Sequence, residues 1–107
     1  MEDIQIEPSE LQVALHSTQD VQLVDVREGW EFALAHLDGA ILMPVHELDR
    51  RLYEIDRERP AVVYCHHGVR SLQAALALRA RGYDRVRSLR GGLERWSRTI
   101  DPTVPRY

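Results

Sequence analysis

The sequence predicts a single α/β domain, residues 1–107, with a mainly parallel sheet covered by helices on both faces. Three observations support this prediction. Apolar runs alternate with segments of helical periodicity along the whole chain. The runs near residues 21–26 and 61–64 lack the polar alternation of a half-exposed strand, which is typical of strands buried in a parallel sheet. A length of 107 residues is enough to bury one core without metals or disulfides.

The first half of the chain supplies three of the predicted strands. Ile4–Ile6 forms a short strand, and Pro8-Ser9-Glu10 has the composition of a helix start. Val21–Val26 is the second strand and is followed by a short helix over 28–35. The third strand covers 40–43 and is stopped by a proline.

The middle of the chain continues the alternation. Leu48, Leu52 and Ile55 recur at i, i+4 and i+7, which predicts a helix from His46 to Asp56. Ala61–Tyr64 then reads as a central strand that runs directly into Cys65.

The last third predicts a long helix, a fifth strand and a final helix. Gly82 is placed to end the long helix, and Val86–Leu89 forms the fifth strand. The final helix follows Gly91-Gly92, and the two prolines of residues 100–107 indicate a loosely packed tail. The apolar face of the long helix is expected to comprise Val69, Leu72, Ala75, Leu76 and Ala80.

Composition excludes several classes of protein. The net charge is −3, so we expect no general affinity for nucleic acid. All fourteen basic residues are arginine, which excludes a phosphate-binding P-loop lysine and Schiff-base chemistry. No segment is long and apolar enough to span a membrane, and the acidic N-terminus is unlike a signal peptide. We therefore expect a cytoplasmic protein; the oligomeric state does not follow from these features.

A lone cysteine, Cys65, is either a small buried hydrophobe or a nucleophile. Its context favours the nucleophile. Cys65 is predicted to lie where a buried strand turns into a helix, at the sheet edge where parallel α/β proteins bind ligands. A tight turn there directs backbone N–H groups inward, and the helix N-terminus adds a partial positive charge. Gly68 permits the turn and Arg70 adds a cation, so we expect a stabilised thiolate.

Four segments together resemble the signatures of the rhodanese family. They are Asp25-Val26-Arg27-Glu28, the stretch Ala35-His36-Leu37-Asp38-Gly39-Ala40-Ile41, the loop Cys65-His66-His67-Gly68-Val69-Arg70-Ser71, and the closing stretch Leu89-Arg90-Gly91-Gly92-Leu93-Glu94-Arg95-Trp96. The segments come in the family's order and cover nearly the whole chain. One departure is Ala35-His36-Leu37, where the family commonly has Gly-His-Ile.

The resemblance implies a five-stranded, mainly parallel rhodanese-like sheet and a sulfurtransferase that works through a Cys65 persulfide. Sulfane sulfur would pass from a donor such as thiosulfate to a thiophilic acceptor, cyanide or a thiol. The expected partners are a small anionic sulfur donor, a protein that carries a persulfide, or a thiol acceptor. No metal and no organic cofactor is implied. His66, His67, Gly68, Val69 and Arg70 are the candidate substrate-binding residues; whether the two histidines touch substrate stays open.

Asp25, Arg27 and Ser71 are candidates for support around this loop. Asp25 and Arg27 follow the second strand and could touch an anionic donor, but an ion pair that ties the strand end to neighbouring turns is the interpretation we prefer. The adjacent imidazoles of His66 and His67 do not suit a zinc site, because structural zinc sites use four spaced ligands.

Two other functions use the same residues. The Cys65…Arg70-Ser71 ending is shared with dual-specificity phosphatases and arsenate reductases of the same fold. Those enzymes have five residues between cysteine and arginine, whereas this chain has four, which suits sulfur better than a tetrahedral phosphate. A non-catalytic module that binds persulfide or senses redox state through Cys65 is the other alternative.

Overall fold

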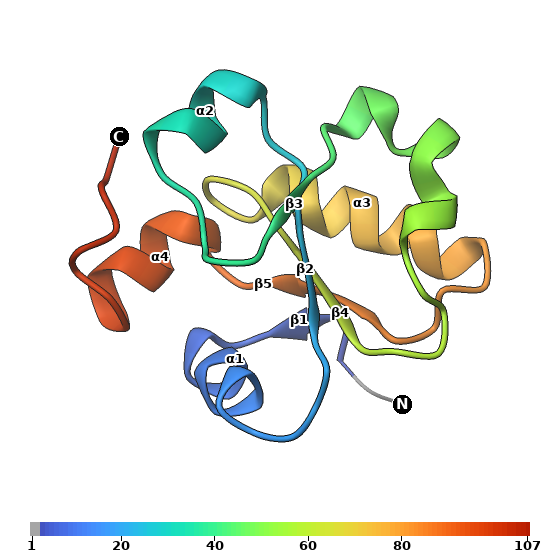
Figure 1. The fold of residues 1–107 in the computed structure, drawn as a ribbon, viewed down its shortest axis with the longest axis horizontal. Helices are drawn as coiled ribbons and strands as arrows, with labels where there is room; N and C mark the ends of the chain where they lie inside the picture. The colour runs from blue at the N-terminus through green and yellow to red at the C-terminus, as the bar shows by residue number, and fades with distance from the viewer. Residues whose placement is uncertain (1–2) are drawn as a thin grey trace.

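The computed structural model describes residues 3–107 and contains one five-stranded sheet. The strand order is β1-β5-β4-β2-β3, and every neighbouring pair is parallel. This confirms the predicted sheet (Figure 1). The strands are β1 (Gln5–Ile6), β2 (Gln22–Asp25), β3 (Ile41–Leu42), β4 (Ala61–Tyr64) and β5 (Val86–Leu89).

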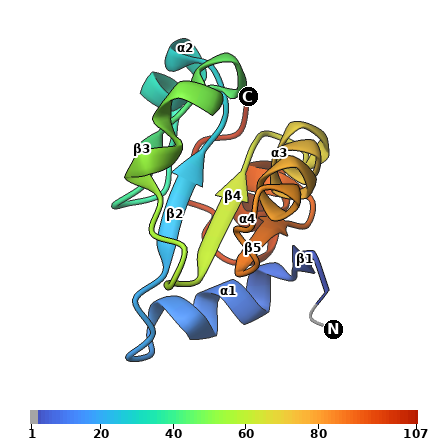
Figure 2. The same ribbon diagram turned by 90° about the vertical axis from the view of Figure 1, so that its right-hand side faces the viewer.

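Helices cover both faces of the sheet, as predicted (Figure 2). Helices α1 (Pro8–Leu15) and α4 (Gly92–Thr99) pack on one face, and α3 (Val69–Ala80) packs on the other. Helix α2 (Gly29–Leu34) follows β2, and two short 3₁₀ helices, η1 (Val45–Glu47) and η2 (Asp49–Glu54), follow β3. Within residues 3–107, no helix combines the length and the apolar character needed to cross a bilayer.

The central strand β4 divides the core into two clusters. Ala61 and Val63 point to the α3 side, and Val62 and Tyr64 point to the α1–α4 side. All four residues are buried, which explains why the run lacks polar alternation. Cys65 continues the alternation toward α3, so its sulfur starts on the side from which the helix approaches.

The prediction of one regular helix over 46–56 was wrong in detail. This segment forms η1 and η2, held by i→i+3 bonds such as Arg51 N–H to the carbonyl of Leu48 at 3.1 Å. In a 3₁₀ helix residues three apart, such as Leu52 and Ile55, lie on the same side. Ile55 and Leu48, which joins the two short helices, are buried in the core, and the apolar spacing alone could not distinguish the two helix types.

The apolar face predicted for α3 was also partly wrong. Val69 and Leu76 are 67% and 55% exposed, whereas the buried residues are Ser71, Ala74, Ala75 and Leu78. The small side chains of the two alanines let the helix lie close to the sheet. Ser71 is buried because the start of the helix faces Cys65, to whose sulfur the backbone N–H of Ser71 donates.

The C-terminal segment 100–107 packs more closely than the sequence suggests. Ile100 and Val104 lie against the α1–α4 side of the core. The Ser97 hydroxyl donates to the carbonyl of Val104 at 2.6 Å, and Arg106 pairs with Glu94 at 2.6 Å. The two prolines prevent helix and strand formation, but they do not prevent these tertiary contacts.

Candidate active site

The loop that leaves β4 is shaped by its contact with the start of α4. The N–H groups of Leu93 and Glu94 donate to the carbonyls of Cys65 and His66 at 2.8 and 3.0 Å. A trans peptide unit directs its carbonyl and its N–H to opposite sides. Because the two carbonyls face α4, the N–H groups of the same peptide units face away from α4.

Glycines make this contact possible. Gly68 has φ +98°, and a Cβ on it would lie 3.2 Å from the backbone nitrogen of Gly91. Gly92 has φ +62°, and a Cβ there would lie 2.4 Å from the carbonyl oxygen of His66. The loop and the Gly91-Gly92 turn therefore approach more closely than a side chain allows.

The Cys65 sulfur accepts hydrogen bonds from the loop. The backbone N–H of Gly68 lies 3.1 Å from Sγ, and that of Ser71 lies 3.3 Å from it. The side chain is buried, with the residue 1% exposed. Of these surroundings, the two backbone donors are the groups that favour negative charge on the sulfur.

A pair of buried hydroxyls extends from the sulfur into the core. Ser71 Oγ lies 3.4 Å from Cys65 Sγ and 2.8 Å from Ser88 Oγ, and both serines have no exposed surface. A hydroxyl can donate or accept. The Ser71 hydroxyl can therefore accept a hydrogen bond from a Cys65 thiol or donate one to a Cys65 thiolate. Only the hydroxyl hydrogens have to rotate between the two cases.

Arg70 pairs with a carboxylate that the sequence analysis did not single out. Its two terminal nitrogens donate to the oxygens of Glu31 in α2 at 2.7 and 2.9 Å, and no hydrogen bond within residues 3–107 joins the guanidinium to Sγ. The hydrogen bonds with Glu31 raise the pKa of Arg70, and a coulombic interaction with Cys65 adds to that shift. The hydrogen bonds from Arg70 lower the pKa of Glu31 to about 2, against the opposing effect of burial.

Asp25 and Arg27 form a buried clamp at the end of β2. Arg27 donates to both carboxylate oxygens of Asp25, at 2.9 and 2.6 Å, and also to the carbonyl of Ala35. Both residues are fully buried. Burial by itself lowers the pKa of Arg27, but hydrogen bonds with Asp25 and Tyr107 outweigh it and raise the pKa. The contacts match the structural role that we preferred for this pair.

The two histidines of the loop stand next to each other on its outer side. Their rings stack with centroids 4.0 Å apart, and His66 is half-buried whereas His67 is exposed. Burial, together with the neighbouring His67, lowers the pKa of His66, so its ring is neutral at pH 7. Val69 points to solvent. Residues 3–107 hold no cluster of three or more His, Cys, Asp and Glu side chains placed to bind a metal ion.

Three residues of the site were missed from sequence: Glu31, Ser88 and Tyr107. Glu31 lies 39 residues before its partner Arg70. The one feature of the sequence that could have indicated it is the position of its carboxylate, one helical turn after the Asp25-Val26-Arg27 segment. Ser88 lies beside Arg87 in a strand that is half polar in sequence, so neither its burial nor its partner Ser71 had a local signal. Tyr107 had no signal, because its segment was expected to be loose.

Comparison with known proteins identifies the class to which this fold and loop belong. The family model described as rhodanese-like domain matches residues 7–99. A rhodanese-like domain protein of Staphylococcus aureus superposes with a TM-score of 0.83 at 27% identity, over 96% of this chain and 97% of that one. The chain therefore belongs to the rhodanese-like domain family.

Two curated relatives specify the class of activity. A sulfurtransferase of Allochromatium vinosum is 40% identical over 100 residues, which is 94% of this chain and 94% of the relative. Thiosulfate sulfurtransferase GlpE of Shewanella oneidensis is 39% identical over 84 residues, which is 78% of this chain and 83% of the relative. The chain is a sulfurtransferase of the rhodanese type.

Proposed function

We propose that Cys65 accepts sulfane sulfur from a small anionic donor such as thiosulfate and carries it as a persulfide to a thiophilic acceptor. The observation that carries this proposal is the pair of backbone N–H groups, from Gly68 and Ser71, within 3.3 Å of the lone cysteine sulfur. A similar chain, GlpE of Shewanella oneidensis, is named for thiosulfate, which supports the choice of donor.

The reaction has two balanced steps. The Cys65 thiolate attacks the outer sulfur of thiosulfate, a sulfur–sulfur bond forms at Sγ, and the sulfur–sulfur bond of thiosulfate breaks as sulfite leaves with the electron pair. The terminal persulfide sulfur is then attacked by cyanide or a thiolate, and the Sγ–S bond breaks to restore the Cys65 thiolate. No external oxidant or reductant is needed, since sulfane sulfur enters and leaves in the same oxidation state.

Four further loop amides are available to the added sulfur or the donor anion. The N–H groups of His66, His67, Val69 and Arg70 donate to no acceptor within residues 3–107. A loop with unpaired amides at a helix N-terminus favours anions. Arg70 supports the loop through Glu31, and the histidines line its outer side.

The direct test is the intact mass of the protein after incubation with thiosulfate. Reduced protein should gain the mass of one sulfur atom, and cyanide should remove it and release thiocyanate. Cys65→Ser should abolish both results while its unfolding transition stays cooperative. If fully reduced protein gains no mass with thiosulfate, with a mercapto-acid or with a protein persulfide, the proposal is wrong.

The two alternative functions give different results in the same experiments. A phosphatase would hydrolyse an aryl phosphate and lose that activity in Cys65→Ser; the four-residue spacing between Cys65 and Arg70 argues against it. A sensor would form the persulfide yet show no turnover with cyanide or thiols. Measured thiocyanate release over many cycles distinguishes the enzyme from the sensor.

A further inference from the structure

Tyr107 lies against the active-site loop although it is distant in sequence. Its ring stacks on the ring of His66, with centroids 3.9 Å apart and planes at 13°. The ring of Trp30 in α2 lies edge-on to the ring of Tyr107, with the centroids 6.1 Å apart. Figure 2 shows the chain end at the same end of the sheet as the loop between β4 and α3. Tyr107 therefore joins α2 to the outer side of the loop.

The hydroxyl of Tyr107 also connects the two ion pairs behind the loop. It accepts a hydrogen bond from Arg27 at 2.6 Å and donates one to Glu31 at 2.8 Å. Burial raises the pKa of Tyr107 to about 12, so the hydroxyl keeps its proton at pH 7. One side chain thus contacts the buried clamp, the partner of Arg70, and a histidine of the loop.

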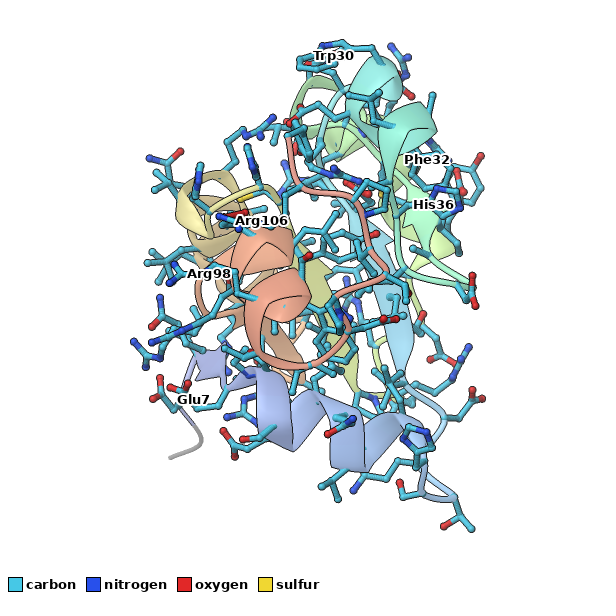
Figure 3. All side chains as sticks on the ribbon, turned by 90° about the vertical axis from the view of Figure 1, so that its left-hand side faces the viewer. Glu7, Trp30, Phe32, His36, Arg98 and Arg106 are labelled. Atoms are coloured by element: carbon cyan, nitrogen blue, oxygen red, sulfur yellow. The ribbon has the colours of Figure 1, made fainter. Side chains whose placement is uncertain are left out.

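The position of Tyr107 is fixed by the segment before it. Arg106 pairs with Glu94 in α4, and the carbonyl of Val104 accepts from Ser97. Figure 3 shows this segment running beside α4 from its far end up toward the labelled Trp30. These contacts hold the ring of Tyr107 against His66 of the loop. Tyr107 itself belongs to no helix or strand.

Cys65 is 1% exposed, so a donor reaches its sulfur only if neighbouring groups move. The rings of Tyr107 and His67 both stack on the ring of His66, the residue that follows Cys65 in the loop. A bulky donor requires a larger displacement of these neighbouring groups than a small anion does.

We propose that Tyr107 is a specificity-determining residue that narrows the approach to Cys65 and thereby favours small sulfur donors over bulky ones. The proposal extends the sulfur-transfer function proposed above and names the size class of its substrate. Tyr107 acts through His66, Glu31 and Arg27 and takes no part in bond making or breaking.

The test compares the rates at which small and bulky alkylating agents modify Cys65. Iodoacetamide is the small probe and a fluorescein-bearing iodoacetamide is the bulky probe; the lone cysteine makes the intact mass an unambiguous readout. Tyr107→Ala should raise the bulky-to-small rate ratio by about threefold or more, the factor that corresponds to the loss of one aromatic stack. Tyr107→Phe keeps the ring and should leave the ratio within about twofold of the original, since the stack persists.

Two further variants separate access from stability. Trp30 is 63% exposed, so Trp30→Ala should fold normally, remove the edge contact and raise the ratio less than Tyr107→Ala does. Tyr53 in η2 is 83% exposed and makes no ring contact with the loop within residues 3–107, so Tyr53→Ala is the matched control and should leave the ratio unchanged. General loosening of the protein would raise both rates together and leave their ratio unchanged.

An unchanged ratio in both Tyr107→Ala and Trp30→Ala overturns the proposal, as does an equal rise for Tyr107→Phe and Tyr107→Ala. Alkylation does not depend on sulfur transfer, so its outcome is separate from that of the thiosulfate experiment. In turnover assays, Tyr107→Ala should lower KM for glutathione persulfide more than KM for thiosulfate.

Discussion

The ion pair between Glu31 and Arg70 allows a prediction about the free energy of unfolding. Both the size of the effect and its pH dependence follow from the structure. In Glu31→Gln the side chain keeps its shape but loses its charge. The variant retains an acceptor for Tyr107, whereas Arg70 loses the carboxylate that binds both of its terminal nitrogens. Glu31 is buried, so water does not replace the lost partner on its side of the pair.

The expected loss of stability follows from the pKa of Glu31. A value of about 2 in place of 4.5 corresponds to roughly 3 kcal/mol in favour of the ionised folded form, because one pKa unit is worth about 1.4 kcal/mol. The Arg70 side chain is 39% exposed, so solvent screens part of this interaction. We therefore expect Glu31→Gln to lower the free energy of unfolding by about 1–2 kcal/mol at pH 7.

The pH dependence has a definite sign. The folded-state pKa of Glu31 is depressed, so its contribution is fully present above pH 4.5, where the carboxylate is ionised in both states. As the pH falls from 4.5 toward 2, the unfolded chain binds a proton first and the contribution is lost. The difference in stability between the original protein and Glu31→Gln should therefore be constant from pH 7 to 5 and shrink below that.

Urea unfolding followed by tryptophan fluorescence at several pH values measures this difference. Glu58→Gln is the control, because Glu58 is an exposed carboxylate with no ion pair to any residue from 3 to 107. A difference below about 0.5 kcal/mol at pH 7, the range of ordinary surface substitutions, would refute the reasoning. So would a difference of equal size at pH 7 and pH 3.

Two further predictions concern the loop and the hydroxyl pair. Gly92→Ala should destabilise the protein and reduce sulfur transfer more than Gly39→Ala does. Both glycines have positive φ, a conformation that costs alanine roughly 1–2 kcal/mol. Only a Cβ at Gly92 would also meet a backbone oxygen, at 2.4 Å. Equal urea midpoints for the two variants would contradict this prediction. Ser71→Ala should slow alkylation of Cys65 by about fivefold, since one hydrogen bond is worth roughly 1 kcal/mol. Ser71→Ala also leaves the Ser88 hydroxyl unpaired, so a variant with alanine at both Ser71 and Ser88 should recover stability but not the alkylation rate. Recovery of both would mean that the Ser71 hydroxyl does not act on the Cys65 sulfur.

The pairing of Arg70 with Glu31 bears on how the site holds an anion. The guanidinium of Arg70 is bound to the carboxylate of Glu31, and the groups that form hydrogen bonds with the Cys65 sulfur are two backbone N–H groups and a hydroxyl. Such groups are held in place by the fold and need no reorganisation when charge develops on the sulfur.

The sequence by itself determined the sheet, the position of the nucleophile and the loop around it. Apolar runs and helical periodicity are local signals, and they placed Cys65 between β4 and α3 because strand and helix boundaries are themselves local. The tertiary structure alone decided which side chains meet there. Glu31 with Arg70, Ser88 with Ser71, and Tyr107 with His66 are contacts between segments far apart in the chain. Each of these contacts depends on how the helices and the C-terminal segment pack against one another. Local sequence patterns do not specify that packing.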